Sequence, residues 1–412
     1  MGLSLISSTS LVQTPYIKVT IGKYSFGCYN KDAVGTEKYP NYINSLEITK
    51  LNGKFNTYKL NIVYTIDEFS DPNFFEKVFS SVSSSREITF TYGDLSATNF
   101  IYKNEKGMIT NVYSNMNVEN RTISYTVEAV SKGILATTGC QTFPVPNNTK
   151  VKPSSVIKTM LAKNNIYGLQ DLFPGMRNLD MVDQLRLIPD NDVEVELNTK
   201  VNMSVLDYLQ YLVSSMRTTN STEDVRLSNF FILTFVDDTS GQLGGPYFKI
   251  VEVDKNKVYP DAYELYIGYP TSNLVSNLSV QNNETYAIYY NYNREAYPTN
   301  YVERIDAYGN KVQTYAPAIS SKNSNFETNP EDRSWWTKVS QYPITLSLDI
   351  KGLLRPAILM TYVKLYIKFF SKLHIHSGVY IITKQVDRVD QSGYRTSLSM
   401  TRVADDPEML II

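Results

Sequence analysis

Alternating apolar and polar positions early in the chain predict a β-hairpin over residues 42–65. The return strand carries its larger apolar side chains on one face, at Tyr58, Leu60, Ile62 and Tyr64. A period of two places these side chains together on one side of a strand. Asn52-Gly53 lies between the two strands, and this pair supplies the positive φ angles of a type I′ turn.

A helical pattern interrupts the strands over residues 71–82. Asp71 can cap the helix and Pro72 suits its first position. The apolar side chains then recur at helical spacing, at Phe74, Phe75, Val78, Phe79 and Val82. Strand patterns resume over residues 87–92, 108–115 and 121–130. One helix crossing a set of hairpins is what a small barrel needs to close its open end.

The pattern changes after a segment rich in Pro and Asn, residues 142–152, which we interpret as a linker. Helical spacing follows from Pro153 and again over residues 204–216, and three strands are predicted between residues 230 and 268. This middle part therefore predicts a small α+β domain.

Strand patterns return from Asn273. They cover residues 274–280 and 285–292, then 358–370, and end in a long hairpin of residues 379–389 and 394–403. The fold class is therefore predicted to be mainly β, with two barrel-like units separated by an α+β insertion. The predicted domains are residues 1–141, 142–270 and 271–412.

Composition supports a folded chain without a strong charge. Of 412 residues, 42% are hydrophobic and 20% charged, and the net charge is −1. A near-neutral chain has no bulk attraction to nucleic acid or anionic membrane. No run reaches the roughly 18 apolar residues that a membrane span needs. The 32 tyrosines favour half-buried strand faces and protein contacts.

Histidine and cysteine, which bind metals and take part in nucleophilic catalysis, are scarce, with two of each in the chain. The two histidines, His374 and His376, would share one strand face, but a metal site needs a further ligand. Cys28 and Cys140 form no CxxC pair and are expected to be buried small side chains. Phosphate-binding and nucleophile-elbow motifs are absent, and Gly241 to Gly245 is interpreted as a tight turn.

Two further features are weak signals of a catalytic or binding site. The adjacent pairs Asp237-Asp238 and Asp405-Asp406 point apart on a strand and are typical of solvated turns. Trp335-Trp336 could form a sugar platform, but paired Trp residues more often pack at a domain edge. We therefore predict no catalytic, cofactor-binding or metal residue, no cofactor, and a protein that is not an enzyme.

The order of these elements resembles the central baseplate hub proteins of contractile phage tails and related injection machines. Four stretches carry the resemblance. They are KLNGKFNTYKLNIVYTIDEFSDPNFFEKVFSSVSSSREITFTYGD (50–94), NMSVLDYLQYLVSSM (202–216), VSNLSVQNNETYAIYY (275–290) and HSGVYIITKQVDRVDQSGYRTSLSMTRV (376–403). The match is one of pattern and order over most of the chain.

The resemblance implies a structural protein of the virion, assembled in the host cytoplasm. It implies a homotrimer whose subunits each carry two tube-like β-barrels, so that three subunits present six similar barrels. Such a ring joins a sixfold tail tube, or its initiator, to a threefold central spike. It also contacts other baseplate proteins and lets DNA pass through its lumen without specific binding. The family has no active-site motif to carry over.

Two other functions stay open at the level of sequence. One is a glycan-binding or receptor-binding β-protein of the tail tip, which would use its tyrosines and Trp335-Trp336. The other is a tail-associated cell-wall hydrolase, which would need two carboxylates across a cleft. The shortage of His and Cys makes the hydrolase the weakest of the three.

Overall fold

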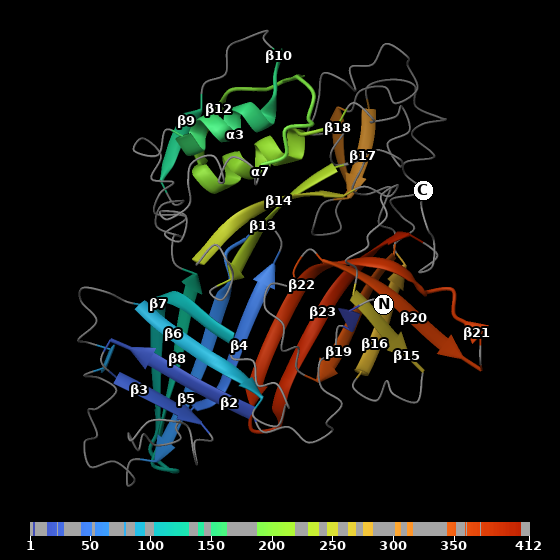
Figure 1. Ribbon diagram of the computed structural model, residues 1–412. Coiled ribbons are helices and arrows are strands. Elements are labelled where there is room, and N and C mark those ends of the chain that lie inside the picture. The colour runs from blue at the N-terminus through green and yellow to red at the C-terminus, as the bar shows by residue number, and fades with distance from the viewer. Residues whose placement is uncertain are drawn as a thin grey trace.

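The computed structural model describes 21 stretches of the chain (Figure 1). They are residues 3–4, 15–22, 24–28, 43–51, 54–65, 78–79, 87–94, 103–131, 139–143, 150–162, 188–218, 230–238, 245–253, 263–268, 275–282, 301–305, 311–315, 344–351, 359, 361–370 and 372–404.

The N-terminal unit is an antiparallel sheet in the order β4-β5-β8-β7-β6-β2-β3. Its strands are β2 (Pro15–Ile21), β3 (Tyr24–Cys28), β4 (Ile43–Leu51), β5 (Thr57–Thr65), β6 (Glu87–Asp94), β7 (Lys103–Asn117) and β8 (Thr122–Ser131). Alternate residues of β2, β4, β5, β6 and β8 face one core, as the period of two predicts. Tyr58 and Phe90 stack within that core, with ring centroids 4.9 Å apart.

The C-terminal unit has the order β16-β19-β23-β22-β20-β15. Its strands are β15 (Tyr263–Ile267), β16 (Val275–Asn282), β19 (Ile344–Lys351), β20 (Tyr362–Phe369), β22 (Gly378–Asp390) and β23 (Gly393–Ala404). The short β1 (Leu3–Ser4) pairs with β15, and β21 (Lys372–Leu373) pairs with β20. A second core lies within this unit and includes Leu346, Leu348 and Tyr380.

The middle part contains the two described helices longer than one turn, which lie at the top of Figure 1 above β13 and β14. Its elements are β9 (Cys140–Phe143), β10 (Lys150–Val151), α3 (Pro153–Ala162), β11 (Val195–Glu196), β12 (Lys200–Ser204), α7 (Val205–Ser215), β13 (Phe230–Asp238) and β14 (Gly245–Val253). Ser204 caps α7 by accepting a hydrogen bond from the Asp207 N–H, which satisfies one donor of its first turn. A separate hairpin is formed by β17 (Tyr301–Ile305) and β18 (Lys311–Tyr315).

The two end units share one strand order. Along the chain, β4, β5, β6, β7 and β8 correspond to β16, β19, β20, β22 and β23. Across the sheet, the five strands of each set lie in the order β4-β5-β8-β7-β6 and β16-β19-β23-β22-β20. In both sets the first strand along the chain pairs with the second, the second with the fifth, the fifth with the fourth and the fourth with the third, and every pair is antiparallel. The units differ at the next strand, since β2 pairs with β6 antiparallel whereas β15 pairs with β20 parallel.

Two irregularities in the ladders of each unit fall at corresponding positions as well. The pairing of β4 with β5 skips Asn44, and the pairing of β16 with β19 skips Ser276. Likewise Thr110 is skipped between β7 and β8, and Thr383 between β22 and β23. A β-bulge is a specific local feature, so two bulges in matching places make the common layout a true internal repeat.

The threonine at the second bulge makes the same hydrogen bond in both units. Thr110 Oγ1 donates to the carbonyl oxygen of Glu128 at 3.1 Å, and Thr383 Oγ1 donates to that of Ser399 at 3.1 Å. Each acceptor belongs to the residue that pairs just beyond the bulge, opposite Asn111 or Lys384. The repeat therefore extends to the side-chain hydrogen bond at its second bulge.

The predicted mainly β fold is confirmed. Closed barrels stay a prediction, because the pairings recorded for the described strands form an open path. The domain limits also stay predictions. The turn at Asn52-Gly53, most of the helix at 71–82 and the strand at 285–292 lie outside the described residues. The strand β19 and the β17–β18 hairpin were not predicted.

Candidate functional site

The two end units are joined edge to edge by β22 and β4. The pairing is antiparallel and runs from Lys384 opposite Leu51 to Asp390 opposite Ser45. The first part of β22 pairs instead with β20, so this strand belongs to both units. In Figure 1 it lies beside β4 although the two strands are more than 300 residues apart in sequence. We call this pairing the intrachain joint.

The hairpin of β22 and β23 reaches into the N-terminal unit. Val389 and Tyr394, next to its turn, are buried in the N-terminal core rather than in the C-terminal one. Tyr394 meets Tyr92 of β6 edge to face, with ring centroids 6.0 Å apart. The two units thus share hydrophobic packing as well as backbone hydrogen bonds.

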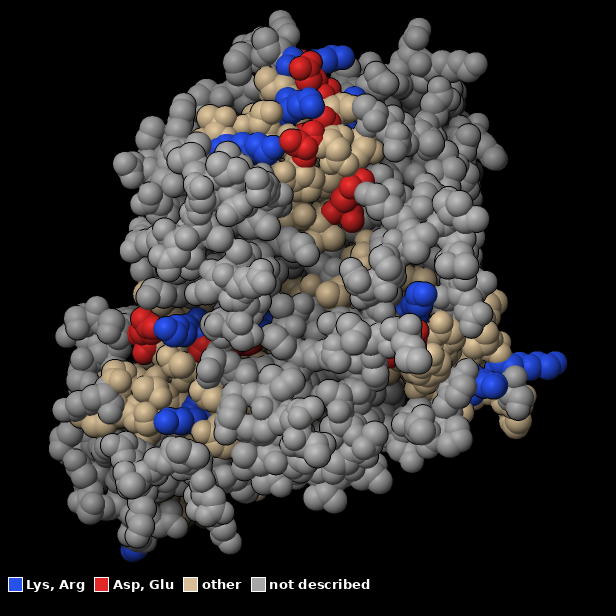
Figure 2. Space-filling model, viewed as in Figure 1, with Lys and Arg blue, Asp and Glu red and all other residues tan. Residues whose placement is uncertain are grey.

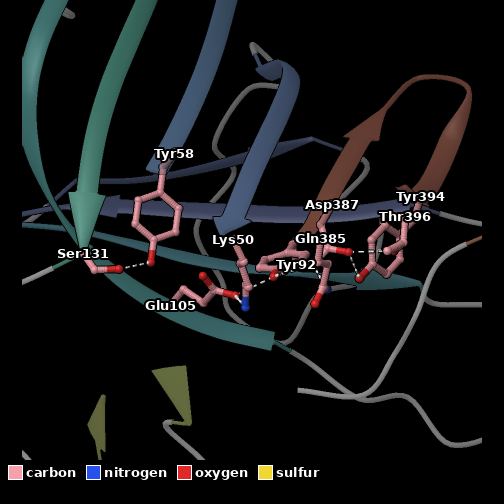
Figure 3. A network of polar contacts seen from close by, with 9 residues as sticks. All are labelled: Lys50, Tyr58, Tyr92, Glu105, Ser131, Gln385, Asp387, Tyr394 and Thr396. Atoms are coloured by element: carbon pink, nitrogen blue, oxygen red, sulfur yellow. Dashed lines mark hydrogen bonds and ion pairs between the residues drawn. The ribbon is translucent and has the colours of Figure 1, made fainter. Parts of the chain in front are cut away.

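A buried polar network crosses the joint (Figure 3). On the N-terminal side, Lys50 Nζ of β4 lies 2.5 Å from Glu105 Oε1 of β7. The same Glu105 oxygen accepts a hydrogen bond from Tyr92 Oη at 2.7 Å. Tyr92 Oη also lies 3.4 Å from Asp387 Oδ2 of β22, and this contact links the two units.

Asp387 is the centre of the C-terminal side. Its two carboxylate oxygens accept hydrogen bonds from Thr396 Oγ1 at 2.6 Å, Gln385 Nε2 at 2.7 Å and Tyr394 Oη at 3.2 Å. Asp387 is 0% exposed, Glu105 2% and Lys50 5%. Buried charges are stable only when paired and hydrogen-bonded, so these contacts fix how the units are joined.

Burial also sets the ionisation of the two tyrosines. Desolvation raises the pKa of Tyr92 well above its ordinary value, and the negative charges of Glu105 and Asp387 raise it further. Desolvation is likewise the main cause that raises the pKa of Tyr394, followed by the charge of Asp387. Both hydroxyls therefore stay protonated and donate hydrogen bonds far into the alkaline range.

The raised pKa values predict a loss of stability at alkaline pH. An unfolded tyrosine ionises near pH ~10, while the folded Tyr92 and Tyr394 do not, so above this pH the unfolded state binds fewer protons. Their contribution is complete below pH ~10 and is lost as pH rises toward the folded pKa values. The Tyr92→Phe/Tyr394→Phe variant is expected to lose stability less steeply between pH 9 and 11 in urea titrations. An equal slope in both proteins would contradict this assignment.

Among the described residues, those that sequence patterns single out do not form a common site. The His374 and His376 rings lie 4.9 Å apart between β21 and β22, at the opposite end of β22 from its hairpin turn. Among the described residues, no group of three or more His, Cys, Asp or Glu could hold a metal ion. Asp237-Asp238 ends β13. Trp335-Trp336, Asp405-Asp406 and most of residues 241–245 lie outside the described residues.

The expectation for Cys140 was wrong. Its side chain is exposed at the start of β9, because the short β9–β12 pair lies at the surface of the middle part. Cys28 lies in β3, but its side chain is outside the described residues.

Sequence patterns also missed the whole polar network. The available signal was an acidic residue, Asp387, between Gln385 and Val389 on one face of a predicted strand. Asp387 shares a face with the buried Val389, and an unpaired carboxylate cannot stay there.

The visible surface carries charges of both signs. Over the helical part at the top of Figure 2, described Lys and Arg side chains lie beside Asp and Glu. No helix of the described residues has both the length and the apolar character needed to span a membrane.

The fold defines a class of mainly β proteins with two repeated sheets joined edge to edge. No protein-family model matches the chain, and no curated protein matches its sequence.

Among solved structures, the chain is similar to a tail protein from Neisseria meningitidis MC58, with 8% identity, a TM-score of 0.47, and 94% of this chain and 96% of that chain covered. It is also similar to the 43 kDa tail protein of prophage MuSo2 from Shewanella oneidensis, with 10% identity, a TM-score of 0.47, and 96% and 100% covered. A third similar structure comes from the Francisella PdpA–VgrG complex, with 11% identity, a TM-score of 0.49, and 95% and 59% covered. The first two of these neighbours are described as tail proteins, and the third belongs to a PdpA–VgrG complex.

Proposed function

We propose that the chain is the structural hub of a phage tail baseplate. Three copies form a ring in which N-terminal and C-terminal units alternate, giving six similar positions. One side of the ring matches a sixfold tail tube or its initiator, and the other a threefold central spike. The lumen lets DNA pass without binding it specifically, and the outer surface contacts other baseplate proteins.

One observation carries this proposal: each chain holds two copies of the same five-strand layout, joined edge to edge. A side-by-side repeat lets a trimer present six equivalent sheets while keeping true threefold symmetry. A chain with a single unit could match only one of the two symmetries. The role is geometric and needs no catalytic group.

The rigid joint supports the same role. A ring that transmits force between a tube and a spike needs fixed angles between its units. The intrachain joint supplies them through seven backbone-paired positions, a shared core and a buried ionic network.

Native mass spectrometry of the purified protein tests the proposal. The expected species has three times the mass of the chain, and it binds a tail tube protein and a central spike protein of the same phage in separate pull-downs. A protein that remains monomeric at every concentration and binds neither partner would contradict the proposal.

A further inference from the structure

Two strand edges are unpaired in the described part of the single chain. The segment of β7 from Ile109 to Asn117 pairs with β8 on one side, but β6 ends opposite Met108 and nothing described pairs beyond it. The strand β16 pairs with β19 and with no other described strand. Open edges of this length are templates for pairing with another chain.

The internal repeat shows what such edges do when they are covered. In the repeat, β7 corresponds to β22 and β16 corresponds to β4, and these are the strands that form the intrachain joint. The match is residue by residue: Met108 and Ile381 are the last residues paired with β6 and β20, and Asn117 and Asp390 end their hairpin strands. The same segment therefore has a partner strand in one unit and has none among the described strands in the other.

The exposed fractions of the side chains differ between β7 and β22 in the same way. Val112 is 38% exposed and Met116 is 57% exposed, although both lie inside a strand. Their counterparts in β22, Gln385 and Val389, are each 1% exposed because β4 and the N-terminal core cover them. The apolar side chains of Val112 and Met116 are therefore suited to a covering strand that the described part of one chain does not supply.

We infer that β7 of one copy pairs antiparallel with β16 of the next copy of this chain. This inference rests on the proposed ring and deepens it by naming the edges that close it. Transferring the register of the intrachain joint places Val112 opposite Asn282 and Asn117 opposite Asn277. Asn115 then lies opposite Ser279.

The pairing is heterologous, because two different edges meet, so it generates a ring where the rotation between copies closes, as in the proposed trimer, and not a two-fold dimer. Each copy contributes one β7 edge and one β16 edge, and closure leaves neither edge open. The intrachain and interchain joints would then alternate around the ring with the same strand geometry.

Disulfide trapping tests the register. Opposed residues of antiparallel strands lie within the Cα separation that a disulfide requires. In a background with Cys28 and Cys140 replaced by Ser, the Asn115→Cys/Ser279→Cys variant is expected to give a covalent ladder that ends at three chains after mild oxidation. The Asn115→Cys/Gln281→Cys control keeps the same strand face but is two residues out of register, and it is expected to stay uncrosslinked.

A second variant tests the edge itself. Val112→Glu/Met116→Glu places charges in the proposed interchain joint and is expected to abolish the trimer while leaving the monomer's unfolding temperature unchanged. The matched control is Val118→Glu, at a residue that is 78% exposed in the turn beyond the paired segment, and it is expected to remain trimeric.

The outcomes separate the two proposals. A native trimer that gives no in-register crosslink, gives equal crosslinking out of register, or survives the double Glu substitution would overturn this inference and leave the ring standing. A chain that is monomeric under all conditions would overturn both.

Discussion

Replacing Lys50 with Met is expected to lower the free energy of unfolding by about 3–5 kcal/mol. The substitution leaves the Glu105 carboxylate, 2% exposed, buried without the cation that lies 2.5 Å away. Tyr92 links Glu105 to Asp387, so the remaining network contains two acidic side chains and no cation from Lys50. Removing one member of a buried ion pair costs more than the pair itself contributes, because the remaining charge cannot return to water. Urea unfolding followed by far-ultraviolet circular dichroism measures the change in the free energy of unfolding.

Lys384→Met is the matched control. Lys384 lies at the same joint, opposite Leu51, but its side chain is exposed. The control is expected to change stability by less than about 0.5 kcal/mol. Equal effects of the two substitutions would show that the buried network does not hold the joint.

The second large effect is expected at equivalent core positions of the two units. Leu60→Ala and Leu348→Ala should each cost about 2–5 kcal/mol, because each removes a leucine side chain that is 0% or 1% exposed. These residues correspond in the repeat, since β5 and β19 hold the same place in their sheets. The shared strand β22 couples the cores, so each substitution is expected to lower one common unfolding transition.

Lys59→Ala and Ser347→Ala provide controls at neighbouring exposed positions of the same two strands. Both are expected to have effects within about 0.5 kcal/mol. Calorimetry that resolves two transitions, with only one of them shifted by each Leu substitution, would show instead that the units unfold independently.

The network also distinguishes the two joints. Lys50, Glu105 and Asp387 of the intrachain joint correspond in the repeat to Asn282, Gly378 and Ser114. If β22 paired with β16 of another copy, Asp387 would lose the contact with Tyr92 that links it to the N-terminal unit. Burying an unmatched charge disfavours that wrong pairing, so the charges select the correct neighbour.

Local pattern predicted the strands whose signal is complete within a few residues. The β4–β5 and β22–β23 hairpins follow from alternation next to a turn. Alternation is just as clear at Leu346, Leu348 and Ile350, so β19 could have been predicted from the same signal. The period of two fixes the faces of a strand but not its neighbours.

The joint and its network could not be derived this way. The partner of β22 is decided by contacts with residues more than 300 positions earlier, and no local preference encodes them. The sequence did show a carboxylate at Asp387 on the same strand face as Val389, which indicates a buried partner without naming it. The bulges that establish the repeat are likewise visible only in the pairing register.

Cryo-electron microscopy of the purified protein, viewed along the ring axis, tests the central claim most directly. Class averages are expected to show a ring of six similar lobes whose true symmetry is threefold, with β7 and β16 of adjacent copies in contact. Particles of single chains, or rings with a number of lobes other than six, would contradict the account.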